Sequence, residues 1–158
     1  MNQLWAESLG KAVDKAGGKA PKASTPFAAI GACDQHSVLQ QVMEGPKNKF
    51  VVFQRVRSSE SRRFKLPKSH FAEFTFMEGR SLGDLLAAEA QATSEALTQV
   101  GVQNMTLMLE DLSAESVGEL LMFWQLVVAT MGECLGIDAF NQPGVELGKR
   151  LAKKILQA

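Results

Sequence analysis

The side chains best suited to move protons near neutral pH are the two histidines, His36 and His70. An imidazole can both give and accept a proton at physiological pH, which suits it to general acid–base chemistry. His36 lies two residues after Asp34, at the start of a predicted helix, so a local hydrogen bond with Asp34 is a purely structural alternative. His70 stands in no motif, and we expect it at the surface or in the core.

The two cysteines indicate no catalytic or metal site. Cys33 and Cys134 lie far apart, without CxxC spacing and without a sequence pattern that suggests an activated thiolate. We therefore expect reduced core or loop thiols, as is usual in a cytosolic compartment. No metal ligation is predicted from them.

Three short segments carry more specific patterns. Residues 140–149 read FNQPGVELGK, residues 33–40 read CDQHSVLQ and residues 3–11 read QLWAESLGK. The first resembles the C-terminal signature of the phosphoglucose isomerase family, in which an aromatic residue precedes Asp or Asn, Gln, any residue, Gly-Val-Glu, two further residues and Lys. The second resembles the segment with the family's ring-opening histidine, and the MEGP that follows at 43–46 is typical of bacterial members. The third resembles the segment that holds the catalytic glutamate, and the resemblance extends from residue 3 to residue 156 in the family's order.

The resemblance implies three catalytic residues. Glu7 would be the base that moves a proton between C1 and C2 of the open-chain sugar, which one carboxylate above an enediol plane can do. His36 would open the hexose ring, and Lys149 would assist at the ring oxygen and C1 hydroxyl. The structural alternatives are a surface Glu7 on an amphipathic helix and a solvated Lys149 paired with Glu146 three residues earlier.

The resemblance also implies a substrate site and partners. Gln3 and Gln142 match positions that touch the bound sugar phosphate, although amides are common structural residues as well. The family's histidine reaches into the neighbouring subunit, which implies a homodimer. No metal or organic cofactor is expected, since acid–base groups suffice.

The family's sugar-phosphate-binding turn and its arginine beside the enediolate find no match, so we expect residues 1–158 to be the C-terminal portion of a two-domain enzyme. Alone, with the N-terminal domain absent, this portion should be weak or inactive.

The elements that would position these residues alternate between helices and strands. Alternation of this kind predicts an α/β domain with a parallel sheet flanked by helices, and the resemblance implies a sugar-isomerase (SIS-like) fold. Helices are predicted at 2–14, 35–43, 81–100, 114–135 and 143–157, and strands at 27–30, 49–56 and 104–109.

The composition is that of a globular protein. Apolar residues make up 46% and charged residues 22%, and 17 basic residues balance 17 acidic ones, so no overall charge would attract nucleic acid or a membrane surface. The longest apolar stretch, 120–131, is shorter than the roughly 20 residues that span a bilayer. We expect a soluble cytoplasmic protein. One local basic cluster can be read as a solvated loop face or as an anion-binding patch; its members are Arg55, Arg57, Arg62, Arg63, Lys65 and Lys68.

The sequence is also compatible with two other roles. One is a non-catalytic, sugar-phosphate-binding regulatory module of the same fold, and the other is a structural or dimerisation fragment. Glu7, His36 and Lys149 occur together, which argues against the regulatory module, because binding alone does not need all three.

Overall fold

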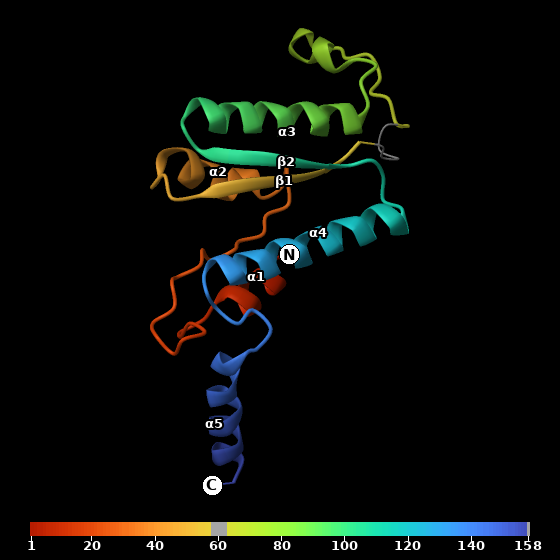
Figure 1. Ribbon diagram of the computed structural model, residues 1–158. Coiled ribbons are helices and arrows are strands. Elements are labelled where there is room, and N and C mark those ends of the chain that lie inside the picture. The colour runs from red at the N-terminus through yellow and green to blue at the C-terminus, as the bar shows by residue number, and fades with distance from the viewer. Residues whose placement is uncertain (58–62, 158) are drawn as a thin grey trace. The chain divides into compact units, whose positions relative to one another are not determined.

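The structure is a computed structural model that describes residues 1–57 and 63–157. The chain forms two compact units. We call residues 1–28 with residues 118–158 the helical unit, and residues 29–117 the sheet unit. Figure 1 shows the helices and strands of both. The helical unit contains α1 (Asn2–Leu9), most of α4 (Ala114–Cys134), the short 3₁₀ helix η3 (Pro143–Val145) and α5 (Glu146–Leu156). The sheet unit contains α2 (Gln35–Glu44), β1 (Phe50–Val56), the 3₁₀ helix η2 (Ala72–Met77), α3 (Leu82–Gln99), β2 (Gln103–Leu109) and the first turn of α4.

The sheet unit is built on two parallel strands. β1 and β2 pair in register from Phe50 opposite Gln103 to Val56 opposite Leu109. Parallel strands need a long crossover, and α3 lies in that crossover and runs along the strands (Figure 1). This is the predicted α/β arrangement with a parallel sheet and flanking helices. Helix α3 starts at a capping box. The hydroxyl of the buried Ser81 accepts a hydrogen bond from the Asp84 backbone N–H, and the Asp84 carboxylate accepts one from the Ser81 backbone N–H, each at 3.0 Å.

Polar residues also define the start of α4. The Ser113 hydroxyl accepts a hydrogen bond from the Ser116 backbone N–H at 3.2 Å, which caps the start of the helix. Asp111 accepts hydrogen bonds from the Ser113 hydroxyl, the Ser113 N–H and the Ser116 hydroxyl. These hydrogen bonds hold the pKa of Asp111 below its ordinary value, because they stabilise the ionised carboxylate. The bond from the Ser113 hydroxyl has the largest effect.

Arg55, Arg57 and Lys65 of the predicted basic cluster make contacts within the sheet unit. Arg55 donates to the backbone carbonyl of Ala87 on α3 at 2.9 Å, and Arg57 pairs with Glu110 at 2.8 Å. Lys65 lies 3.8 Å from the Asp84 carboxylate, and Arg62 lies outside the described residues. These contacts favour a surface role over an anion-binding patch.

The core of the helical unit joins α1, α4 and the two loops beside them. Its buried members are Leu9, Ala20, Val128, Ile137 and Ala139. Leu9 and Ile137 are fully buried, so the end of α1 and the chain after α4 are held against the same apolar cluster. Burying side chains of this size stabilises the fold by roughly 1.5–3 kcal/mol each.

A glycine ends α4 and turns the chain back onto the helix. Gly136 has φ +65°, a conformation that glycine adopts without steric cost. The Ile137 N–H donates to the carbonyl of Gly132 at 2.9 Å and the Gly136 N–H to that of Glu133 at 3.0 Å, which is the Schellman pattern. The turn places Ala139 directly on Gly132, where an added Cβ would lie 2.7 Å from the Cβ of Ala139.

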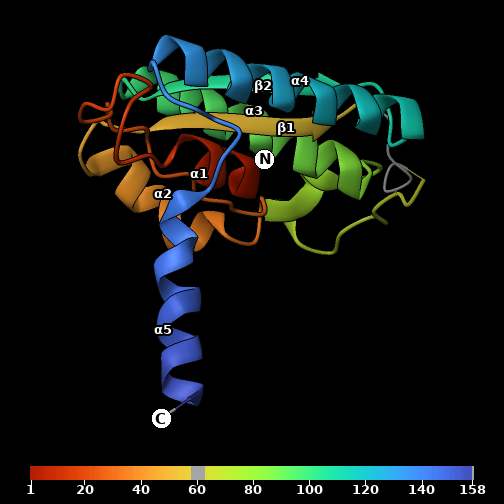
Figure 2. The ribbon, with the colours of Figure 1, turned by 60° about the horizontal axis from the view of Figure 1, so that its bottom comes forward.

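Helix α5 has an uncovered apolar face. Leu147, Leu151 and Ile155 follow one another at four-residue spacing and are 57%, 51% and 75% exposed. All described residues of α5 are exposed, and Figure 2 draws it as a single straight helix.

Helix α4, with 21 residues, is long and apolar enough to cross a membrane by length and composition alone. It is longer than the apolar stretch at 120–131 that the sequence shows. The core helix of a soluble protein passes the same test. On α4, Trp124, Val128 and Gly132 are buried, whereas Leu121, Met122 and Leu126 are more than half exposed, and 17% of the apolar stretch is buried.

The predicted elements are confirmed with four differences. No strand forms at 27–30, where Phe27 and Ile30 are 75% and 72% exposed, because no described strand pairs with this segment. Helix α1 ends at Leu9 rather than at residue 14, since Gly10 leaves the helical conformation. The last helix is divided into η3 and α5, and η2 was not predicted. Residues 58–62 lie outside the described residues.

The close contact at Gly132 generates a prediction. Gly132→Ala should lower the free energy of unfolding by about 1–3 kcal/mol, because the new methyl group overlaps Ala139. Gly118→Ala on the same helix is the matched control, since a Cβ there meets no atom within 4 Å. It should gain up to about 1 kcal/mol from helix propensity. Thermal or urea unfolding would measure both, and equal stability of the two variants would contradict the packing described here.

Candidate functional site

The candidate site is built around the carboxylate of Glu7 on α1. Gln3 precedes Glu7 by one helical turn, so the two side chains lie on the same face. The Gln3 Nε2 donates a hydrogen bond to Glu7 Oε1 at 3.0 Å. Both residues are exposed, while Leu9 on another face of the helix is fully buried. The apolar face therefore anchors α1 and leaves Gln3 and Glu7 accessible.

The second oxygen of Glu7 is bound by a residue far along the chain. The Gln142 Nε2 donates to Glu7 Oε2 at 2.9 Å, across a separation of 135 residues. Each carboxylate oxygen thus accepts a hydrogen bond from a different amide, and the orientation of the carboxylate is fixed from two sides. Three of the five predicted site residues, Gln3, Glu7 and Gln142, therefore form one connected group.

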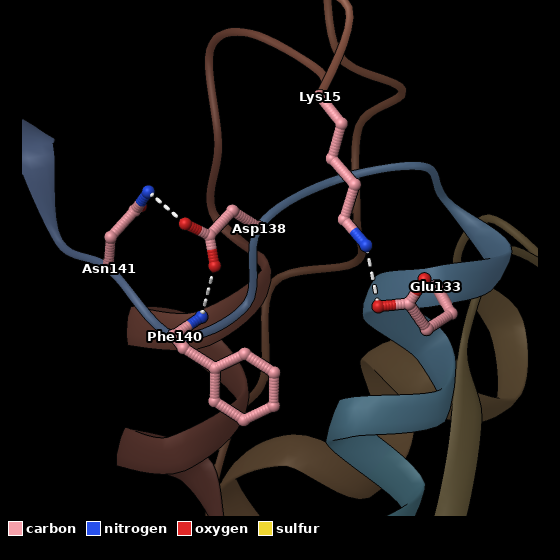
Figure 3. Close-up of polar contacts among 5 residues, drawn as sticks. All are labelled: Lys15, Glu133, Asp138, Phe140 and Asn141. Carbon is pink, nitrogen blue, oxygen red and sulfur yellow. Dashed lines mark hydrogen bonds and ion pairs between the residues drawn. The ribbon is translucent and has the colours of Figure 1, made fainter.

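The loop that carries Gln142 is braced internally by Asp138. One oxygen of Asp138 accepts from the Phe140 backbone N–H at 2.9 Å, and the other accepts from the Asn141 side-chain amide at 2.6 Å. Figure 3 shows both bonds, and beside them the ion pair of 2.6 Å between Lys15 and Glu133. Two constraints thus fix the loop at its start: the Schellman turn before it and the Asp138 side chain within it.

A lysine ties this loop to α1. The ammonium group of Lys11 donates to the backbone carbonyl of Glu7 at 2.8 Å and also to the backbone carbonyl of Asn141. Lys11, Asp138 and Asn141 were not predicted as site residues. Lys11 is the last residue of the segment 3–11 that resembles the family, and it lies four residues after Glu7, where a cation complements the end of a helix.

Lys149 lies on α5, next to Glu146. Its ammonium group is 2.7 Å from the Glu146 carboxylate, and both side chains are more than half exposed. This is the i,i+3 pair named above as the structural alternative for Lys149. No described contact joins Lys149 to Glu7.

His36 is the second residue of α2, in the sheet unit, and its side chain is exposed. Its structural alternative, a hydrogen bond with Asp34, is absent from the described part of the chain. Asp34 instead accepts a hydrogen bond from the backbone N–H of Ile30 at 2.6 Å. His70 and both cysteines are exposed as well, so the core position considered for them is not adopted.

The arrangement around Glu7 suits proton transfer. Within residues 1–57 and 63–157, no group of three or more His, Cys, Asp and Glu side chains could hold a metal ion. An accessible carboxylate that is held in place by neutral amides can act as a base on a bound substrate.

Comparisons with known proteins identify the family. A model of the family described as phosphoglucose isomerase matches residues 1–158. The chain belongs to the phosphoglucose isomerase family. The segments that suggested this family on sequence grounds contain the Glu7 group, and the family expected from them is confirmed.

Curated relatives agree with this assignment. The chain is 39% identical over 155 residues to "Glucose-6-phosphate isomerase" of Carboxydothermus hydrogenoformans, covering 98% of this chain and 33% of that protein. It is 41% identical over 157 residues to the protein of the same name from Campylobacter jejuni, covering 99% and 37%. The chain therefore spans about a third of the length of these phosphoglucose isomerase relatives.

Solved structures show the same fold. A hypothetical protein of Thermus thermophilus matches with a TM-score of 0.88 and 36% identity, covering 99% of this chain and 37% of that one. A glucose-6-phosphate isomerase from Chlamydia trachomatis matches with a TM-score of 0.82 and 29% identity, covering 99% and 31%. The α/β fold is thus that of phosphoglucose isomerases.

The exposure of Lys149 generates a prediction. Lys149→Met should change the free energy of unfolding by less than about 0.5 kcal/mol, because an exposed i,i+3 ion pair contributes little. Glu146→Gln, which removes the other partner, is the matched control and should have an equally small effect. Thermal unfolding would measure both, and a large loss for Lys149→Met alone would show that Lys149 has a structural role that the ion pair does not explain.

Proposed function

We propose that this segment is the C-terminal portion of a glucose-6-phosphate isomerase, which interconverts glucose 6-phosphate and fructose 6-phosphate. The observation that carries the proposal is the Glu7 carboxylate, with its two oxygens bound by the amides of Gln3 and Gln142. Family membership and the curated names of the relatives support it. In this proposal the isomerase acts in glycolysis and gluconeogenesis, in the cytoplasm.

Glu7 is the proposed base of the isomerisation. It removes the proton from C2 of the open-chain aldose and returns a proton to C1, passing through an enediol. Two hydrogen bonds hold the carboxylate in one orientation, so that it can reach both carbons without a change of position. Each amide uses one N–H on Glu7 and keeps a second N–H and a carbonyl oxygen, which can bind sugar hydroxyls or the phosphate.

His36 and Lys149 are proposed to open the sugar ring. An imidazole can exchange protons with the ring oxygen and the C1 hydroxyl, and an ammonium group beside them stabilises developing negative charge. The exposed position of His36 on α2 leaves its ring available to a substrate, including one bound to a second subunit. The ion pair with Glu146 would have to open or reorient for Lys149 to contact the sugar.

The complete site is proposed to need more polypeptide than these residues. The chain spans about a third of its relatives, and a homodimer with an additional N-terminal sugar-phosphate-binding domain is the expected assembly. The uncovered apolar face of α5 supports an assembly of this kind, because exposed apolar stripes are buried when a partner is present. The SIS-like character of the domain is part of the same proposal.

A non-catalytic regulatory module is the less favoured alternative. The curated relatives described above carry the name of the enzyme, and a carboxylate fixed on both oxygens is more than sugar binding requires. A purely structural fragment would tolerate any substitution at Glu7.

The role of Glu7 can be tested by Glu7→Gln in the full-length protein. The isomerisation kcat should fall by about 10²–10⁴-fold, because the amide cannot accept the substrate proton. Exchange between the anomers of fructose 6-phosphate, followed by NMR, should continue, since ring opening does not use Glu7. Glu133→Gln is the matched control, an exposed carboxylate in the same unit that pairs with Lys15. Full isomerase activity in Glu7→Gln would overturn the assignment.

The role of His36 can be tested by His36→Ala. Turnover of the cyclic anomers should slow more than turnover of the small open-chain fraction, because only the cyclic forms need ring opening. Single-turnover measurements at different anomer ratios would separate the two. His70→Ala is the matched control, since His70 is also exposed but has no assigned role. Equal losses on cyclic and open-chain substrate would contradict a ring-opening role.

A further inference from the structure

Lys11 connects two parts of the helical unit that lie far apart in the sequence. Helix α1 ends at Leu9, and its last carbonyl groups lack helical partners. The Ala6 carbonyl accepts from the Gly10 N–H at 3.1 Å, and the Leu9 carbonyl accepts from the Lys11 N–H at 2.9 Å. The Glu7 carbonyl accepts from the Lys11 ammonium group at 2.8 Å. Lys11 thus completes the helix end that carries Glu7.

The same ammonium group reaches the loop that carries Gln142. It donates to the carbonyl of Asn141, 130 residues away along the chain. Asn141 is the residue directly before Gln142, and its own side chain is bound to Asp138. Because Asp138 makes the loop rigid, fixing the Asn141 carbonyl also fixes the backbone from which the Gln142 side chain extends.

Lys11 is well placed to hold this position. Its side chain is half-buried, and its charge lies at the C-terminal end of α1, where a helix favours a cation. Hydrogen bonds from charged donors are stronger than those between neutral groups. Lys15, by comparison, binds Glu133 on α4 and contacts neither Glu7 nor the loop at 138–142 through its side chain.

We propose that Lys11 is a positioning residue: it clamps the Asp138–Gln142 loop to the end of α1, so that the Gln142 amide meets Glu7 in the orientation that proton transfer needs. The catalytic part of this inference rests on the proposed isomerase function. The ammonium group of Lys11 has three N–H donors, and two of them bind the carbonyl groups of Glu7 and Asn141. Lys11 can therefore act without touching the substrate.

The test compares three single variants of the full-length protein and, in a separate kinetic comparison, Gln142→Leu with and without Lys11→Met. Lys11→Met keeps the length of the side chain and removes the ammonium group. Lys11→Arg keeps a charged group with several donors that can bridge two carbonyls. Lys15→Met is the matched control, because it removes a lysine from the same segment after α1 and leaves the two hydrogen bonds of Lys11 in place. Isomerase kinetics, thermal unfolding and hydrogen exchange followed by mass spectrometry are measured on all three.

Lys11→Met should lower kcat by between about tenfold and about a hundredfold, because displacement of a site group by 1 Å can cost about 10² in rate. Its unfolding temperature should stay close to that of Lys15→Met, and Lys11→Arg should recover most of the activity. If Lys11 acts through Gln142, adding Lys11→Met to Gln142→Leu should lower kcat by no more than about twofold further, since coupled residues are not additive. Hydrogen exchange at 138–142 should rise in Lys11→Met and not in Lys15→Met.

Several results would overturn the proposal. Activity of Lys11→Met within twofold of Lys15→Met would do so. A loss of kcat in Lys11→Met that accompanies a lower unfolding temperature and is not rescued in Lys11→Arg would also overturn it. So would fully additive effects of Lys11→Met and Gln142→Leu on kcat. Hydrogen exchange separates this proposal from the proposed function. If the parent protein does not isomerise sugar phosphates, the isomerase assignment fails, while exchange at 138–142 still decides whether Lys11 clamps the loop.

Discussion

The hydrogen bond between Gln142 and Glu7 is the contact on which the candidate site depends. It joins two residues 135 positions apart at 2.9 Å and fixes the second oxygen of a carboxylate whose first oxygen is bound by Gln3. Only the Gln3 bond is local, because a helix supplies it through four-residue spacing. The Gln142 bond forms only if α1 and the loop after α4 are brought to the same place.

Packing brings them there. Leu9 and Ile137 are fully buried in one apolar cluster, so α1 and the end of α4 share a core. Gly132 allows Ala139 to lie against α4, at a distance that a side chain at 132 would not permit. The Schellman turn at Gly136 sets the direction in which the chain leaves the helix. Apolar burial, a close contact and a glycine turn together bring the chain that leads to Gln142 into the same apolar cluster as the end of α1.

Polar contacts then determine the precise geometry. Asp138 braces the loop from within, and Lys11 binds both the end of α1 and the Asn141 carbonyl. These groups are exposed or half-buried, so each bond exchanges with water and contributes modestly to stability. Their importance lies in orientation, since they hold the Gln142 amide and the Glu7 carboxylate in one arrangement, and the proposed role of Glu7 as a base depends on such positioning.

The sequence by itself determined the family, the α/β class and most helices and strands, because these depend on ordered motifs and on hydrophobic periodicity. It misplaced a strand at 27–30, since a strand exists only when another strand pairs with it. Only the tertiary structure decided that Gln142 binds Glu7 and that Lys11 holds the loop. Both contacts join residues more than a hundred positions apart, and no periodic pattern encodes them, because they arise from where the packed core places the ends of its elements.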